Sequence, residues 1–133
     1  MNLIGAALCV GTLSCAVAAA SAQETAGPAT RTILQRSDVA ASPAQEVIFG
    51  TVQVSPGGGN PFHTHFGTEM GYVIQGRIRL EVRGMPSREL GPGDSFMVQR
   101  GFPHRSVPLG TAPVRLVNTW TVDKGKPILT PAP

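Results

Sequence analysis

The chain has 133 residues, which is enough for one domain, and its formal net charge of +3 comes from 11 basic against 8 acidic side chains. The basic residues are scattered and few aromatic residues accompany them, whereas a nucleic-acid-binding surface needs a basic patch interleaved with aromatic side chains. Composition therefore speaks against nucleic acid as a partner and favours a single small domain.

Residues 1–22 carry no charged side chain and contain a short apolar run that ends at the small residues Ala20, Ser21 and Ala22. This pattern predicts a secretory signal peptide that is cleaved after Ala22, so we expect a periplasmic or secreted protein. A membrane-spanning helix is a weaker interpretation, because the segment is rich in Ala, Gly, Ser and Thr. Both cysteines, Cys9 and Cys15, fall in this segment, so the mature chain would form no disulfide. The alternative is a lipoprotein in which Cys15 is acylated and retained.

The region that follows is predicted as a lead-in over residues 23–45 and a strand-rich domain over residues 46–122. Residues 31–36 predict a short strand, after which Ser37 and Asp38 are expected to cap one helical turn. Residues 46–54 are rich in β-branched and aromatic side chains and predict a strand.

The clearest strand is 77–83, where apolar and charged residues alternate, so that one face is buried and the other is exposed. The turn Gln75-Gly76 before it predicts a hairpin with residues 70–74. Shorter strands are expected at 88–90 and 95–99, and a long one at 114–122, followed by a proline-rich tail over 123–133 that lies extended or loose.

The frequency of turn-forming residues indicates the fold class. The sequence contains 16 glycines and 12 prolines, and no segment keeps apolar residues at helical spacing. Many short strands joined by tight turns predict an all-β fold, either two packed sheets or a closed barrel.

The three histidines of the chain are candidates for one site. His63 and His65 are two residues apart, so in a strand both imidazoles lie on one face. Glu69 follows beyond Gly67, where a bend or bulge would redirect the carboxylate. Imidazoles together with a carboxylate suit a divalent transition metal such as Fe, Mn, Ni, Cu or Zn.

These residues belong to a longer pattern, Gly57-x5-His63-Thr64-His65-x3-Glu69-x6-Gly76. It resembles the first motif of the cupin superfamily, and Gly93, Gly101, Pro103 and His104 resemble the second. Gln99 and Pro108 depart from that second motif, which has proline and asparagine there. The resemblance covers roughly residues 46–122 and points to small single-domain cupins of the quercetin-dioxygenase-like type.

The resemblance implies a jelly-roll β-barrel that binds one divalent metal through His63, His65, Glu69 and His104, and often a homodimer. The alternative is that these four residues bind no metal and only fill a polar barrel interior. With four protein ligands, a metal that prefers six keeps two adjacent positions for water, substrate or dioxygen.

The leading functional hypothesis is an oxygenase acting on a small enol, diketone or phenolic substrate, with Glu69 also able to serve as a base. Candidates for lining the substrate pocket are Met70, Phe102, Gln53, Gln99 and Arg100. One alternative is a non-enzymatic module that binds a small ligand or metal. Another is an isomerase or lyase acting on a sugar acid; its cation inside the barrel would have to be an arginine, because both lysines lie in the tail.

Overall fold

The computed structural model of the protein describes residue 27 and residues 29–133. The predicted signal peptide, its cleavage site and both cysteines lie outside the described residues. The described residues form ten strands and no helix, which confirms the predicted all-β class. Accordingly, this part of the chain offers no helix long and apolar enough to cross a bilayer.

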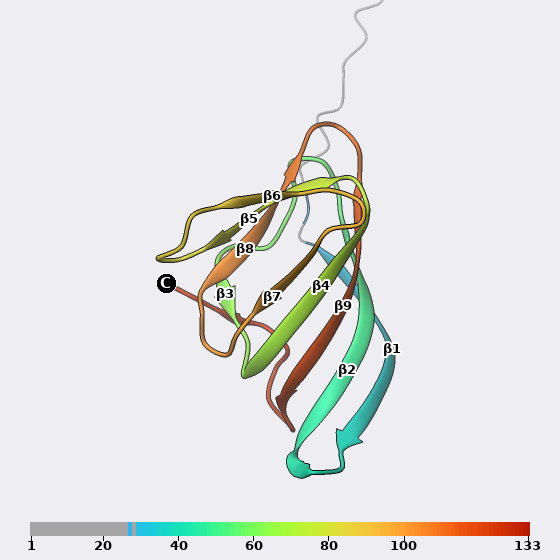
Figure 1. Cartoon of the computed structure of the whole chain (residues 1–133), viewed down its shortest axis with the longest axis vertical. Helices are drawn as coiled ribbons and strands as arrows, with labels where there is room; N and C mark the ends of the chain where they lie inside the picture. Colours follow the sequence, from blue (N-terminus) through green and yellow to red (C-terminus); the bar gives the residue numbers. More distant parts are fainter. Residues whose placement is uncertain (1–26, 28) are drawn as a thin grey trace, which may run out of the picture.

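The strands form two five-stranded antiparallel sheets that face each other as a jelly roll (Figure 1). The first sheet has the order β1 (Thr30–Val39), β2 (Ser42–Val54), β9 (Val114–Asp123), β4 (Gly67–Gln75), β7 (Ser95–Val98). The second has the order β10 (Thr130–Pro131), β3 (His63–Thr64), β8 (His104–Leu109), β5 (Arg77–Val82), β6 (Arg88–Leu90).

The predicted hairpin at Gln75-Gly76 is wrong, because β4 and β5 belong to different sheets. β4 pairs with β7 and β9, whereas β5 pairs with β6 and β8. Gly76 has a φ of 76° and carries the chain from one sheet to the other. Alternation of apolar residues reports which face of a strand is buried, and it does not report which strand lies beside it.

Strands also form on both sides of the predicted domain, in residues 30–39 and 130–131. β1 continues through Ser37 and Asp38, which pair with Val47 and Glu46, so the predicted helical turn does not form. The strand prevails because its backbone groups bond along β2 instead of within a turn. In the tail, β10 pairs with β3, next to His63.

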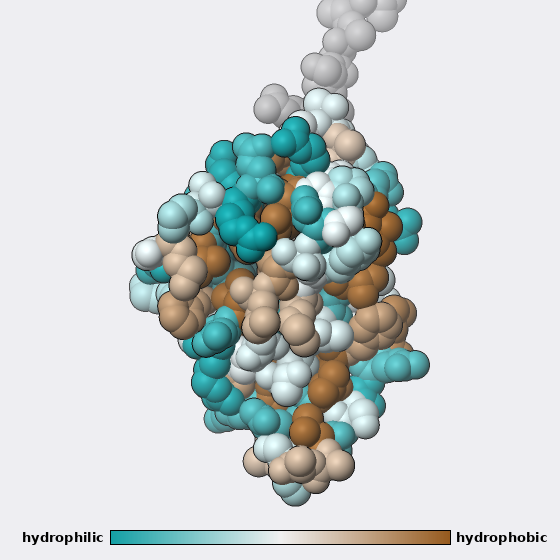
Figure 2. Space-filling view, in the orientation of Figure 1, coloured by the Kyte–Doolittle hydropathy of each residue, from teal (hydrophilic) through white to brown (hydrophobic). Residues whose placement is uncertain are grey.

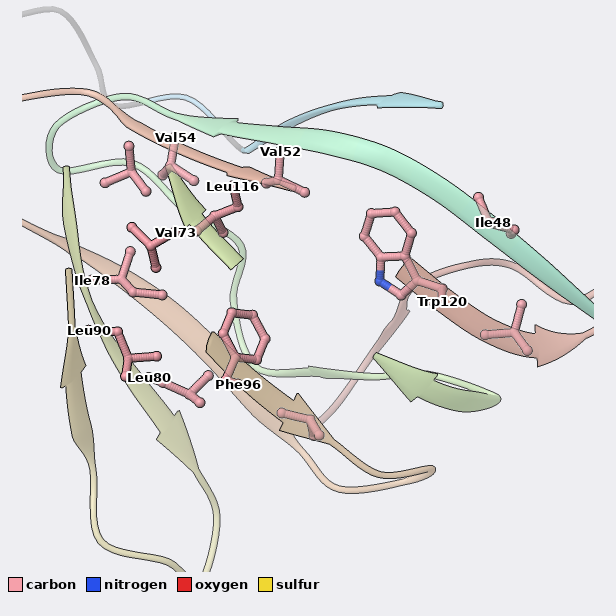
Figure 3. Packing of buried hydrophobic residues seen from close by; sticks show 13 residues of the cluster. Ile48, Val52, Val54, Val73, Ile78, Leu80, Leu90, Phe96, Leu116 and Trp120 are labelled. Atoms are coloured by element: carbon pink, nitrogen blue, oxygen red, sulfur yellow. The ribbon is translucent and has the colours of Figure 1, made fainter. Parts of the chain in front are cut away.

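The core lies between the sheets and is built from inward-facing positions of both, among them Ile78 and Leu80 as predicted. Figure 3 shows most of its side chains in one group around Val73 and Leu116, with Trp120 set apart near Ile48. The apolar residues on the outer faces of β4 and β7 are exposed instead: Met70, Tyr72, Ile74 and Met97. Figure 2 shows tan and brown side chains on this face of the molecule.

Candidate metal centre

The four predicted ligands meet inside the barrel. His63 lies on β3, His65 just beyond its end, Glu69 on β4 and His104 at the start of β8. One ligand atom from each residue lies within 4.8 Å of the others. All four side chains are buried, and the imidazole centroids are 4.5 to 5.1 Å apart. This compact set is small enough to share a single ion, since metal–ligand distances of about 2.0–2.2 Å are usual for these donors.

The histidine rings are oriented by the backbone. His63 Nδ1 lies 2.9 Å from the carbonyl oxygen of Pro61, and His104 Nδ1 lies 2.9 Å from that of Phe102. His65 Nδ1 bonds the carbonyl oxygen of Ile128 in the tail. Because a carbonyl only accepts, each Nδ1 carries the proton and donates it. With Nδ1 occupied in this way, Nε2 is the ring nitrogen left to act as the ligand atom, which is the arrangement that metal-binding histidines adopt.

The carboxylate faces two of these nitrogens. Glu69 Oε2 lies 3.1 Å from His65 Nε2 and 2.9 Å from His104 Nε2. Two lone pairs this close repel unless a positive charge lies between them, either a proton that makes an imidazolium or a metal cation. A divalent metal removes the repulsion while the rings stay neutral, so the donor set fits such an ion.

The ionisation of the site supports the same conclusion. Burial lowers the pKa of His63 from 6.5 to about 4, which keeps this imidazole neutral near pH 7. Burial alone would raise the pKa of Glu69, but in the metal-free site a proton on Nε2 of His104 or His65 takes the place of the cation and bonds Oε2; this outweighs burial and holds the pKa of Glu69 well below its usual value. Glu69 is therefore an anion at neutral pH, as a metal ligand must be.

The second oxygen of Glu69 is held by two buried residues of β9. Asn118 Nδ2 donates to Glu69 Oε1 at 2.7 Å, and Trp120 Nε1 donates to the same oxygen at 3.0 Å. The strand register places Trp120 directly opposite Glu69, and Figure 3 shows the indole nitrogen turned toward the interior. These two donors fix the carboxylate so that Oε2 alone points at the histidines.

A cavity of about 30 Å³ opens beside the cluster and is lined by three of the ligands, His63, Glu69 and His104. Since a water molecule needs about 10–15 Å³ measured this way, the cavity has room for about two. Its polar lining also includes Arg31, Asn60, Ser106 and Asn118.

None of the five residues predicted to line the pocket borders this cavity. Met70 points outward from β4, where the odd-numbered positions such as Glu69 face inward. Gln53 points outward from β2, where the even-numbered positions such as Val52 face inward. Phe102 and Gln99 border a separate hollow with Met85 and Met97. Arg100 is exposed and forms a two-bond ion pair with Asp123, at 2.6 and 2.9 Å.

Sequence reasoning missed the polar residues that do surround the cluster. Asn118 and Trp120 carried a signal, because both occupy the inward phase of β9 and Asn118 is polar among Val114, Leu116 and Val122. No signal in the sequence identified Arg31, because only its pairing with Val52 shows that it faces the interior.

Comparison with known proteins agrees with this architecture. Residues 50–120, more than half of the chain, match the family of the cupin domain. A germin-like protein 3-8 from Oryza sativa subsp. japonica is 33% identical over 79 residues, which cover 56% of this chain and 35% of that protein.

Solved structures include an oxalate oxidase, with 28% identity, a TM-score of 0.58 and coverage of 71% of this chain and 51% of that one. They also include the DMSP lyase DddQ from Ruegeria pomeroyi DSS-3, with 27% identity, a TM-score of 0.56 and coverage of 61% and 41%. The chain spans less than half the length of the curated relatives it matches. With the match to the family, the jelly-roll sheets and the buried cluster of three histidines and a glutamate, the chain belongs to the cupin superfamily.

Proposed function

We propose that the protein is a divalent-metal enzyme of the quercetin-dioxygenase-like type, an oxygenase for a small substrate that chelates metal through oxygen atoms. The observation that carries the proposal is the cavity, which opens directly onto His63, Glu69 and His104. A ligand in it reaches the flank of the cluster that the protein leaves uncovered. The oxalate oxidase similarity supports a redox reaction at such a centre.

A divalent metal in this site supplies Lewis acidity and, if it is redox-active, one-electron chemistry with dioxygen. The chain's own residues supply the rest. His63, His65, Glu69 and His104 hold the ion, and the buried walls exclude bulk water from it. Asn118 and Trp120 keep Glu69 Oε1 occupied. For Glu69 to act as a base it must use Oε2 or break these bonds.

The volume of the cavity favours small substrates. A volume of about 30 Å³ holds about two water molecules, so the walls must move apart to admit an enol or diketone of a few carbons, and they must move further for a phenolic ring.

The test is oxygen uptake by protein loaded with Fe(II), Mn(II), Ni(II) or Cu(II), offered acetylacetone and related small diketones. We expect uptake with at least one metal, and none with the H104A variant, which lacks one ligand. Absence of uptake with every metal and substrate in the panel contradicts the oxygenase proposal.

A lyase or isomerase acting on a small acid is the second candidate. It is favoured by Arg31, because this reaction calls for a cation inside the barrel and Arg31 borders the cavity. The DMSP lyase similarity is in keeping with redox-neutral chemistry on this scaffold. Product formation without oxygen uptake, under argon, distinguishes this candidate from the oxygenase. If the metal-loaded protein binds the ligand but turns over none of it, the protein is the non-enzymatic binding module instead.

Export and self-association complete the proposal. Export predicts a secreted or periplasmic chain that begins at Gln23, which amino-terminal sequencing of the mature protein tests; an acylated Cys15 at the amino terminus indicates the lipoprotein instead.

A homodimer would cover the exposed Met70, Tyr72 and Met97 on β4 and β7. Sedimentation of the wild type and of the M97E variant tests this, and a wild-type monomer at micromolar concentration contradicts it.

A further inference from the structure

Arg31 places a positive charge in the cavity beside the metal centre. It lies on the edge strand β1, opposite Val52 of β2, and therefore faces the core. Its guanidinium carbon lies 5.2 Å from the centre of the Trp120 ring. Arg31 precedes residues 50–120, which match the cupin family, so the charge is a feature of this chain's own amino-terminal strand.

Two residues that line this cavity each carry a buried polar atom without a partner among the described residues. Arg31 Nε and Asn118 Oδ1 are buried, and neither has a hydrogen bond to any of the described residues. The orientation of the Asn118 amide is fixed, because its Nδ2 donates to Glu69. The site therefore offers one free donor, which is cationic, and one free acceptor. Leaving such groups unpaired costs about 1–3 kcal/mol each, so a ligand or water that pairs them is favoured.

The charges in the site favour an anion. With neutral imidazoles, Glu69 is the single anion among the cluster and Arg31, and it faces a divalent metal and a guanidinium, so positive charge is in excess. Burial lowers the pKa of Arg31, partly offset by the charge of Glu69, yet arginine stays protonated in proteins because its ordinary pKa is so high. A planar guanidinium matches a carboxylate better than any other common group.

We propose that the cavity binds a short-chain carboxylate, preferably a hydroxy acid, whose carboxylate pairs with Arg31 and whose hydroxyl donates to Asn118 Oδ1. This inference rests on the proposed function and names its substrate class. Arg31 is then a substrate-binding residue that the family motifs do not include. Because the cavity holds about two water molecules as it stands, its walls must move apart even for a ligand of a few carbons, and larger ligands are disfavoured.

The experiment measures binding to Zn(II)-loaded protein, because zinc has no redox chemistry and no turnover of the oxygenase type can interfere. The probes are lactate, lactamide, which lacks the negative charge, and propionate, which lacks the hydroxyl. Calorimetry gives the affinities. Fluorescence of Trp120, the only tryptophan of the chain, gives a second readout close to Arg31.

We expect lactate to bind at least tenfold more tightly than lactamide, and severalfold more tightly than propionate. The R31Q variant should lose at least tenfold in lactate affinity and less than twofold in lactamide affinity, with unchanged zinc content. R31K should recover only part of the loss, because lysine keeps the positive charge but cannot form the two parallel hydrogen bonds that a guanidinium makes with a carboxylate. R115Q is the matched control: Arg115 is exposed on β9, so removing its charge should leave all three affinities unchanged.

The proposal is overturned if lactate does not bind, if wild-type protein binds lactate and lactamide equally, or if R31Q binds lactate as wild type does. The comparison of lactate with lactamide on wild-type protein stands even if R31Q fails to fold. Binding that depends on Arg31 without oxygen uptake by the Fe(II) form rejects the oxygenase and keeps this inference. If the wild type and R31Q take up oxygen equally with a neutral diketone, the oxygenase stands and this inference is rejected.

Discussion

Replacing Trp120 by phenylalanine tests whether the fixed carboxylate of Glu69 determines metal affinity. The substitution keeps an aromatic ring in a fully buried position and removes the N–H that donates to Glu69 Oε1 at 3.0 Å. A hydrogen bond to a charged group contributes about 1.5–3 kcal/mol. Loss of a residue that orients a metal ligand typically costs about 10–100-fold in metal affinity, which is about 1.4–2.8 kcal/mol. The two estimates agree, so we expect W120F to bind metal about 10–100-fold more weakly than wild type.

Competition with a chromophoric chelator measures this affinity, with Zn(II) and Mn(II) titrated separately. The control is I48V, because Ile48 is equally buried and pairs with Trp120 across the sheet but donates no hydrogen bond. It should cost about 0.5–1.5 kcal/mol of stability and change metal affinity less than twofold. If folded W120F binds metal within twofold of wild type, or if I48V weakens binding as much, the indole hydrogen bond does not control the site.

The remaining predictions concern the ligands and the strand contacts around them. E69Q, which removes the anionic ligand and keeps its shape, should lose most of its bound metal by elemental analysis; full metal content in folded E69Q contradicts the assignment. G67A should lower the free energy of unfolding by about 3 kcal/mol in urea, because the new Cβ would lie 1.8 Å from the carbonyl oxygen of Thr121; G27A, with nothing near its Cβ, is the neutral control. In the metal-free protein the pKa of His63 is about 4 when folded and near 6.5 when unfolded, so the unfolded chain binds more protons between these values. The contribution of His63 to the stability of the metal-free protein should therefore be fully present above pH 6.5 and be lost as the pH drops toward 4. A urea midpoint that stays constant over that window refutes this. Chelator added to metal-loaded protein should lower the unfolding temperature, because metal at 100 times its Kd stabilises by about 2.7 kcal/mol; an unchanged temperature at pH 7.5 means that no metal was bound.

The all-β class and the ligand set could be predicted because both depend on local spacing. Alternation along residues 77–83 reports a half-buried strand wherever that strand lies, and the spacing of His63, His65 and Glu69 belongs to a known motif. Strand partners were less accessible, since Gly76 turns the chain equally well within one sheet or between two. The pocket residues could not be inferred from closeness in sequence: Met70 adjoins Glu69 but points to the opposite face of β4.

The sequence by itself determined which side chains can bind a metal and that they are carried by short strands, because ligand chemistry and strand periodicity belong to the residues. Only the tertiary structure decided what surrounds the ion. Asn118 and Trp120 lie some fifty positions beyond Glu69 and reach it through the pairing of β9 with β4, and Arg31 enters the cavity through the pairing of β1 with β2. Long-range strand pairing sets these neighbours, and no local pattern in the chain encodes it.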